Sequence, residues 1–114
     1  IALIGSAALE TAYSNDRAPD LAFAQQVYGY GKKDDILLAI STSGNSANVI
    51  YAASVAKAKE MTVIGLTGND GGKLRKYSDI LLNVTEKETY RIQELHLPVY
   101  HALCLATENE FFGD

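Results

Sequence analysis

Cysteine, clustered basic residues and long apolar runs are all scarce in this sequence, and each scarcity excludes a class of protein. The 114 residues hold one cysteine, Cys104, which rules out an internal disulfide and a cysteine-rich zinc site. Its apolar helical surroundings predict a buried, unreactive thiol. Lysine and arginine are scattered and the net charge is −4, so we expect no binding to nucleic acid. No apolar run approaches membrane-spanning length and no signal peptide is visible, which predicts a cytoplasmic domain without a membrane partner.

The most informative segment is an apolar run, residues 36–40, that breaks off into a turn rich in hydroxyl groups. An alanine-rich helical pattern follows at once, which predicts a strand, a loop and a helix in succession. Backbone N–H groups at a helix start point outward without partners, and four hydroxyls accompany them here: Ser41, Thr42, Ser43 and Ser46. Gly44 allows close approach of the backbone to a ligand, and the absence of lysine excludes a nucleotide-binding P-loop. The turn therefore reads as a neutral cradle for phosphate, or alternatively as a turn that only caps the helix.

Strand and helix patterns alternate along the whole chain. We expect strands at residues 1–4, 36–40, 62–67 and 79–84, and helical segments at residues 19–28, 46–60, 73–77 and 90–112. This alternation predicts one α/β domain over residues 1–114, with a parallel sheet and helices on both faces, as in a flavodoxin-like three-layer sandwich. The chain starts abruptly at Ile1 inside a strand pattern and without an initiator methionine, which indicates part of a longer domain.

The last predicted helix is apolar on most of its circumference between residues 95 and 106. Such a helix needs cover on several sides, and in a chain this short we expect other subunits to provide it. Pro98 predicts a kink near Glu94. Gln93 and His101 share one face at i and i+8, where an amide and an imidazole could meet one ligand or metal, whereas His96 points roughly 140° away from His101. A histidine in an apolar helix is more often a hydrogen-bonded core or interface residue, and this is our interpretation of His96.

Three blocks together resemble the bacterial phosphoheptose isomerases of the sugar isomerase (SIS) domain superfamily. They are the segment from Ile40 to Ile50 that holds the serine turn, Leu66-Thr67-Gly68 with Asp70-Gly71-Gly72-Lys73, and Arg91-Ile92-Gln93-Glu94 with His96 and His101. The serine turn is shared by many SIS proteins, and the other two blocks narrow the resemblance to this branch. The resemblance covers the chain from about Ser14 onward.

The resemblance implies roles for individual residues. Ser41, Thr42, Ser43 and Ser46 would bind the sugar phosphate, and Asn15, Asp16 and Gln93 would contact substrate. His101 would be a catalytic acid/base, and Gln93 and His101 would ligate zinc. The family reaction is the aldose–ketose isomerisation of sedoheptulose 7-phosphate to D-glycero-D-manno-heptose 7-phosphate, which needs an acid and a base. The resemblance also implies a homo-oligomer, expected to be a tetramer.

The same resemblance implies that this chain is only the C-terminal part of such an enzyme. The family's amino-terminal helices, first strand, catalytic glutamate and a further histidine ligand have no counterpart here, so we expect the chain alone to be inactive. Two other functions stay open at this point. One is a non-catalytic SIS module that binds a sugar phosphate as a signal, and the other is a protein-interaction tetramer that binds the bacterial replication initiator. The histidine at position 101 favours the isomerase.

Overall fold

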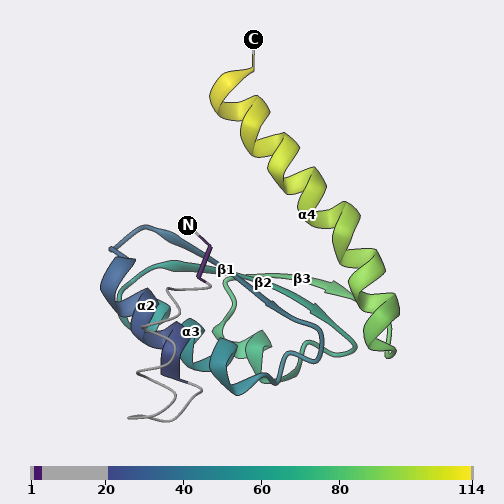
Figure 1. The fold of residues 1–114 in the computed structure, drawn as a ribbon, viewed down its shortest axis with the longest axis horizontal. Coiled ribbons are helices and arrows are strands. Elements are labelled where there is room, and N and C mark those ends of the chain that lie inside the picture. Colours follow the sequence, from purple (N-terminus) through teal and green to yellow (C-terminus); the bar gives the residue numbers. More distant parts are fainter. Residues whose placement is uncertain (1, 4–20, 114) are drawn as a thin grey trace.

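A three-stranded parallel sheet forms the centre of the structure, a computed structural model that describes residues 2–3 and 21–113. The strands β1 (Ile36–Ser41), β2 (Thr62–Gly68) and β3 (Ile80–Val84) lie side by side in that order. The chain between and around them forms α2 (Ala22–Tyr30), α3 (Ala47–Ala58), the 3-10 helix η2 (Gly72–Tyr77) and α4 (Thr89–Phe112). This element order is the strand–helix alternation expected from the sequence (Figure 1).

The predicted parallel pairing is confirmed by the register of the strands. Residues of β1 pair with β2 from Ile36 opposite Thr62 onward, and β2 pairs with β3 from Ile64 opposite Ile80 onward. The strand predicted at residues 1–4 is not seen at its two described residues, Ala2 and Leu3; the other two lie outside the described residues. The other element ends match the prediction or differ from it by up to three residues.

One face of the sheet carries the hydrophobic core. Side chains alternate between the two faces of a strand, so Ala39 and Val63 point to the same side as the helix α3. Small alanines of α3, among them Ala53 and Ala56, are fully buried there and let the helix approach the strands closely. Helix α2 packs beside α3, and η2 adds Leu74 to the same core. These helices form the lower layer in Figure 1.

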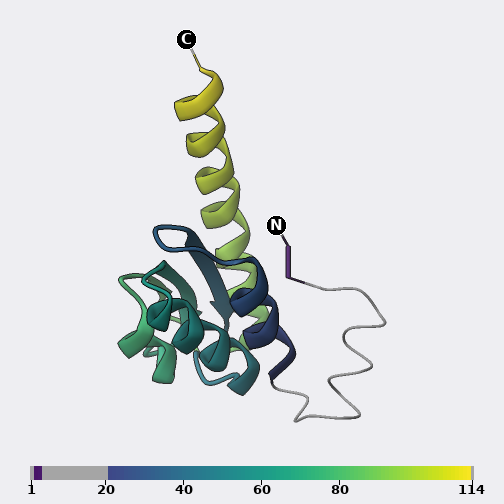
Figure 2. The same cartoon turned by 90° about the vertical axis from the view of Figure 1, so that its left-hand side faces the viewer.

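Among the described residues, only the first turns of α4 cover the opposite face. Ile92 packs on Gly68 so closely that a Cβ on that glycine would lie 2.6 Å from Ile92 Cγ1. After His96 no residue of α4 is buried, and the helix continues through Pro98 and projects beyond the sheet (Figures 1 and 2). The predicted helices on both faces are therefore present, although the upper layer is partial. The prediction of a buried Cys104 is wrong: the thiol lies on this projecting part and is exposed.

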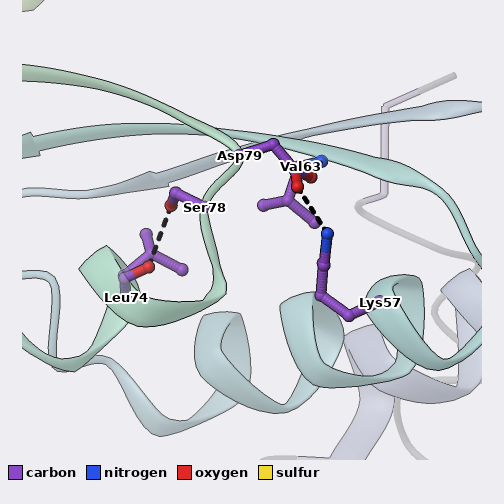
Figure 3. Close-up of polar contacts among 5 residues, drawn as sticks. All are labelled: Lys57, Val63, Leu74, Ser78 and Asp79. Atoms are coloured by element: carbon purple, nitrogen blue, oxygen red, sulfur yellow. Dashed lines mark hydrogen bonds and ion pairs between the residues drawn. The ribbon is translucent and has the colours of Figure 1, made fainter.

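At the amino-terminal edge of the sheet, Asp79 ties three elements together (Figure 3). Its carboxylate accepts a hydrogen bond from the Val63 amide at 2.7 Å and from the Lys57 ammonium at 2.5 Å. The hydrogen bond from Lys57, aided by the Val63 N–H, lowers the pKa of Asp79 below its ordinary value. This group lies at the end of the sheet opposite the serine turn, so its role is structural.

Within the described part of the chain, no helix is long and apolar enough to cross a membrane.

Candidate functional site

The serine loop, residues 41–46, lies at the carboxyl end of β1 and leads directly into α3. The Gly68 amide donates to the Thr42 carbonyl at 2.9 Å, which fastens the loop to the end of β2. In parallel α/β sheets, ligands bind at this edge, where strand ends and helix starts meet. The predicted position of the loop is therefore confirmed.

Three of the four predicted phosphate-binding hydroxyls also form hydrogen bonds within the loop itself. Ser41 is 5% exposed; its Oγ accepts a hydrogen bond from the Gly44 amide at 3.1 Å and lies 3.0 Å from Ser46 Oγ. Ser43 Oγ accepts from the Asn45 amide at 3.0 Å, which leaves its own hydrogen free to donate. Ser43 and Ser46 are exposed and Thr42 is half-buried. The geometry thus gives Ser41 a shaping role, and the other three hydroxyls remain accessible to a ligand.

The conformation of the loop depends on Gly44. Its φ is +71°, a left-handed conformation that side-chain-bearing residues rarely adopt, and a Cβ there would collide with the Gly71 carbonyl. The α3 start that follows is open: none of the described residues accepts a hydrogen bond from the amides of Ser46, Ala47 or Asn48. Amides and hydroxyls therefore converge on the positive end of the α3 dipole, an arrangement that binds an anion without a basic side chain.

Gln93 and His101 are both exposed on α4, whereas Asn15 and Asp16 lie outside the described residues. Counting from the buried Ile92, His101 lies about 180° around the helix and so points away from the sheet. The residues described do not bring His101 onto the serine loop of the same chain.

His96 occupies the buried side of α4, as expected for a core histidine. It is 2% exposed, and its Nε2 lies 2.7 Å from the Thr67 carbonyl oxygen. A carbonyl only accepts, so Nε2 must carry the proton and donate. The network continues from Thr67 Oγ1 to Asn83 Oδ1 at 2.9 Å, and from Asn83 Nδ2 to the Asn69 carbonyl at 2.8 Å. These bonds fasten α4 to the carboxyl ends of β2 and β3.

The described residues do not by themselves fit a zinc ion. Among them, no three histidine, cysteine or acidic side chains converge. Gln93 and His101 are eight residues apart, which separates their backbones by about 12 Å along the helix axis. A zinc site that used both would need further donors from outside this part of the chain.

The described structure also contains a large hollow away from the serine loop. It has a volume of about 770 Å³ and opens along β1, with mostly apolar residues such as Phe23, Leu37 and Met61 around it. It contains none of the predicted site residues, and we interpret it as a gap in apolar packing.

Sequence reasoning did not single out Asn45 or Asn83, which join neighbouring segments in the structure. Asn45 Oδ1 accepts from the Lys73 amide, and Asn83 bridges Thr67 and Asn69. Asn45 stands between two serines that were noticed, so the only signal was its position. Asn83 carried a weak signal as a polar residue within an apolar strand.

Comparison with known proteins gives phosphoheptose isomerases among the relatives of this chain. The chain is 43% identical over 114 residues to a phosphoheptose isomerase of Sulfurimonas denitrificans and 48% identical over 107 residues to one of Neisseria gonorrhoeae. These matches cover 100% and 91% of this chain, but only 58% and 54% of the relatives' length. The chain thus spans little more than half the length of the curated relatives it matches.

Solved structures give the same result. The phosphoheptose isomerase of Neisseria gonorrhoeae superposes with a TM-score of 0.92 at 45% identity, covering 96% of this chain and 61% of that one. The enzyme of Francisella tularensis gives 0.87 at 44% identity, covering 91% and 56%. The SIS domain family matches residues 1–68, which include the serine loop. The chain belongs to the SIS domain family.

Proposed function

We propose that this chain is the phosphate-binding part of a sugar-phosphate isomerase that acts on sedoheptulose 7-phosphate in the cytoplasm. The single observation that carries the proposal is the serine loop at the start of α3. Its accessible hydroxyls and the open amides of residues 46–48 form a neutral anion cradle at the carboxyl edge of the sheet. The phosphoheptose isomerases to which the chain is similar support the choice of substrate.

The reaction we assign is a proton transfer along the sugar chain. One proton leaves carbon 1 of the ketose and one is delivered to carbon 2, while a proton moves from the oxygen on carbon 1 to the oxygen on carbon 2. The product is D-glycero-D-manno-heptose 7-phosphate, and no oxidant or reductant is required. We assign His101 the role of an acid/base in this transfer and Gln93 the role of a substrate contact, because both side chains are exposed on α4.

We further propose that the protein is a homo-oligomer, and expect a tetramer. One apolar side of the sheet leaves Ile36 64% exposed and Ile80 51% exposed. Next to it, α4 carries exposed leucines at positions 95, 97 and 105. Apolar surface of this extent marks an interface. A second copy of the chain bound on this side would also bring its own side chains to the outward face of α4, which carries His101.

Zinc is part of this proposal only as an ion whose remaining ligands come from outside the described residues. Gln93 and His101 would be two of its ligands, and the bound ion would polarise the sugar oxygens. Zinc content measured by mass spectrometry on the purified intact protein tests this assignment. Roughly one ion per site, lost in a His101→Ala variant, is the expected result, and full zinc occupancy in that variant would contradict it.

The test of function is a turnover assay on the intact protein with sedoheptulose 7-phosphate, with the aldose product followed by NMR. A Ser43→Ala/Ser46→Ala double variant should weaken sugar-phosphate binding by roughly 1–3 kcal/mol, since hydrogen bonds to a charged group are lost. His101→Ala should lower turnover by roughly 10²–10⁴-fold, the range for a positioned acid or base. Glu110→Ala, an exposed change about 180° around the same helix from His101, is the matched control and should leave turnover unchanged.

A protein that binds the sugar phosphate through the serine loop but shows no turnover would instead be the non-catalytic binding module. A protein that shows neither binding nor turnover would overturn the proposal and favour the interaction tetramer.

A further inference from the structure

The turn after β2, residues 70–73, packs directly against the serine loop although nearly 30 residues separate the two in the chain. The Leu74 amide donates to the Gly44 carbonyl at 2.8 Å, and the Lys73 amide donates to Asn45 Oδ1 at 2.9 Å. We call these two hydrogen bonds the loop clamp. Two consecutive amides, those of Lys73 and Leu74, thus bind two consecutive residues of the serine loop.

The clamp completes the capping of η2. The first amides of a helix have no partner within the helix, and a polar side chain just before it usually accepts from them. Here the N-cap residue Gly71 has no side chain, and Asp70 Oδ1 accepts from the first amide, that of Gly72, at 2.9 Å. The serine loop supplies the acceptors for the next two amides, one from the Asn45 side chain and one from the Gly44 carbonyl.

The fit of the two segments leaves no room for a side chain on the turn. Gly72 has a φ of +55°, and a Cβ there would lie 2.5 Å from the Ser43 carbonyl oxygen and 2.7 Å from Asn45 Oδ1. The paired glycines of residues 71 and 72 therefore permit the contact on which the clamp depends.

We propose that Asn45 is a positioning residue for phosphate binding, which acts by clamping the serine loop to the turn at residues 70–73. This inference rests on the proposed function of the serine loop. Asn45 lies between Ser43, whose Oγ accepts from its amide, and Ser46, whose hydroxyl and amide are offered to the ligand. A clamped loop holds these donors in place before the ligand arrives, whereas a free loop has to be ordered on binding, which weakens affinity.

The experiment measures binding of sedoheptulose 7-phosphate and of inorganic phosphate to the intact protein by calorimetry, with kcat and KM alongside. Asn45→Ala removes the acceptor and should weaken both ligands by about 3- to 10-fold, the effect of one ordinary hydrogen bond. It should raise KM and leave kcat within about twofold, because the clamp holds the phosphate end and not the reacting carbons. Hydrogen exchange of the Lys73 amide should become faster, whereas Asn45→Asp, which keeps an oxygen at that place, should keep the exchange slow.

The Lys73 ammonium is the alternative explanation for a loss of phosphate affinity in Asn45→Ala. Repeating the substitution in a Lys73→Ala background separates the two explanations. Lys73→Ala keeps the backbone amide and hence the clamp, so the loss caused by Asn45→Ala must persist in that background. If the loss disappears there, or if Asn45→Ala binds phosphate as tightly as the parent, the inference is overturned while the proposed function stands. If the parent binds neither ligand, the proposed function fails first, and the inference fails with it.

Discussion

Replacing His96 tests whether the contact between α4 and the end of β2 holds the helix on the sheet. The two histidines of α4 differ sharply in setting: His96 is 2% exposed and hydrogen-bonded to the Thr67 carbonyl, whereas His101 is exposed. His96→Ala deletes a buried ring and leaves a buried carbonyl without its donor. His101→Ala removes an exposed ring that makes an edge-on contact with the Tyr100 ring.

The expected loss of unfolding free energy for each variant follows from the burial and the hydrogen bonds of the side chain removed. Loss of a hydrogen bond with a buried carbonyl left unsatisfied costs about 1–3 kcal/mol. Truncation of a large buried side chain adds a cavity, and such changes typically cost about 2–5 kcal/mol in all. We expect His96→Ala to lower the free energy of unfolding by about 2–4 kcal/mol, and His101→Ala to change it by less than about 0.5 kcal/mol, as for other surface positions. His96→Gln keeps an N–H near the position of Nε2 and should recover part of the loss.

The assay is urea unfolding of the intact protein, followed by circular dichroism at one fixed protein concentration because assembly affects stability. Equal stability of the His96→Ala and His101→Ala variants would refute the reasoning. It also follows that a His96 variant is no control for packing in a catalytic study of His101, although the two share a helix and a ring. Removal of His96 should damage the fold, and any loss of turnover in that variant should track its loss of stability.

Two further predictions concern opposite ends of the sheet. At the amino-terminal end, the folded-state pKa of Asp79 lies below its unfolded value near 3.8, so its charge stabilises the fold above that pH and the contribution is lost as pH falls through the folded-state pKa. Asp79→Asn should therefore lower Tm at pH 7, and its Tm and that of the parent should converge in acid; a gap independent of pH would contradict the ion-pair explanation. At the carboxyl end, Gly44→Ala should destabilise the protein by about 1–2 kcal/mol because of its positive φ. It should also abolish phosphate binding, since the added Cβ meets the Gly71 carbonyl; unchanged calorimetric affinity would refute this.

The parts of the fold that could be predicted are those encoded by local pattern. The apolar runs of β1 and β2 are separated by an amphipathic segment rich in alanine, and such a unit folds back only as a parallel pair with a crossover helix. The serine loop was recognisable because its hydroxyls and glycine stand between those two patterns. Local pattern also gave the start of α4 to within one residue, at Thr89.

The parts that could not be predicted depend on which surfaces meet. The apolar sequence around Cys104 predicted a buried thiol. In the described structure no residue of α4 after His96 is buried, so this apolar sequence is exposed. Ser41 and Ser46 read as equivalent hydroxyls, and only the fold of the loop buries Ser41. Asn45 gave no signal beyond its position among the serines, because its partner is a backbone amide nearly 30 residues away.

The structure separates the two halves of the proposed chemistry onto different elements. The proposed phosphate site consists of the serine loop and the turn at residues 70–73, both of which are fixed to β1 and β2 by backbone hydrogen bonds. His101, the proposed acid/base group, lies on the outward side of α4, about 180° around the helix from Ile92, which packs on the sheet. Changes in the loop and changes on α4 should therefore be separable in kinetics: loop variants should alter KM, whereas variants of the outward helix face should alter turnover and assembly.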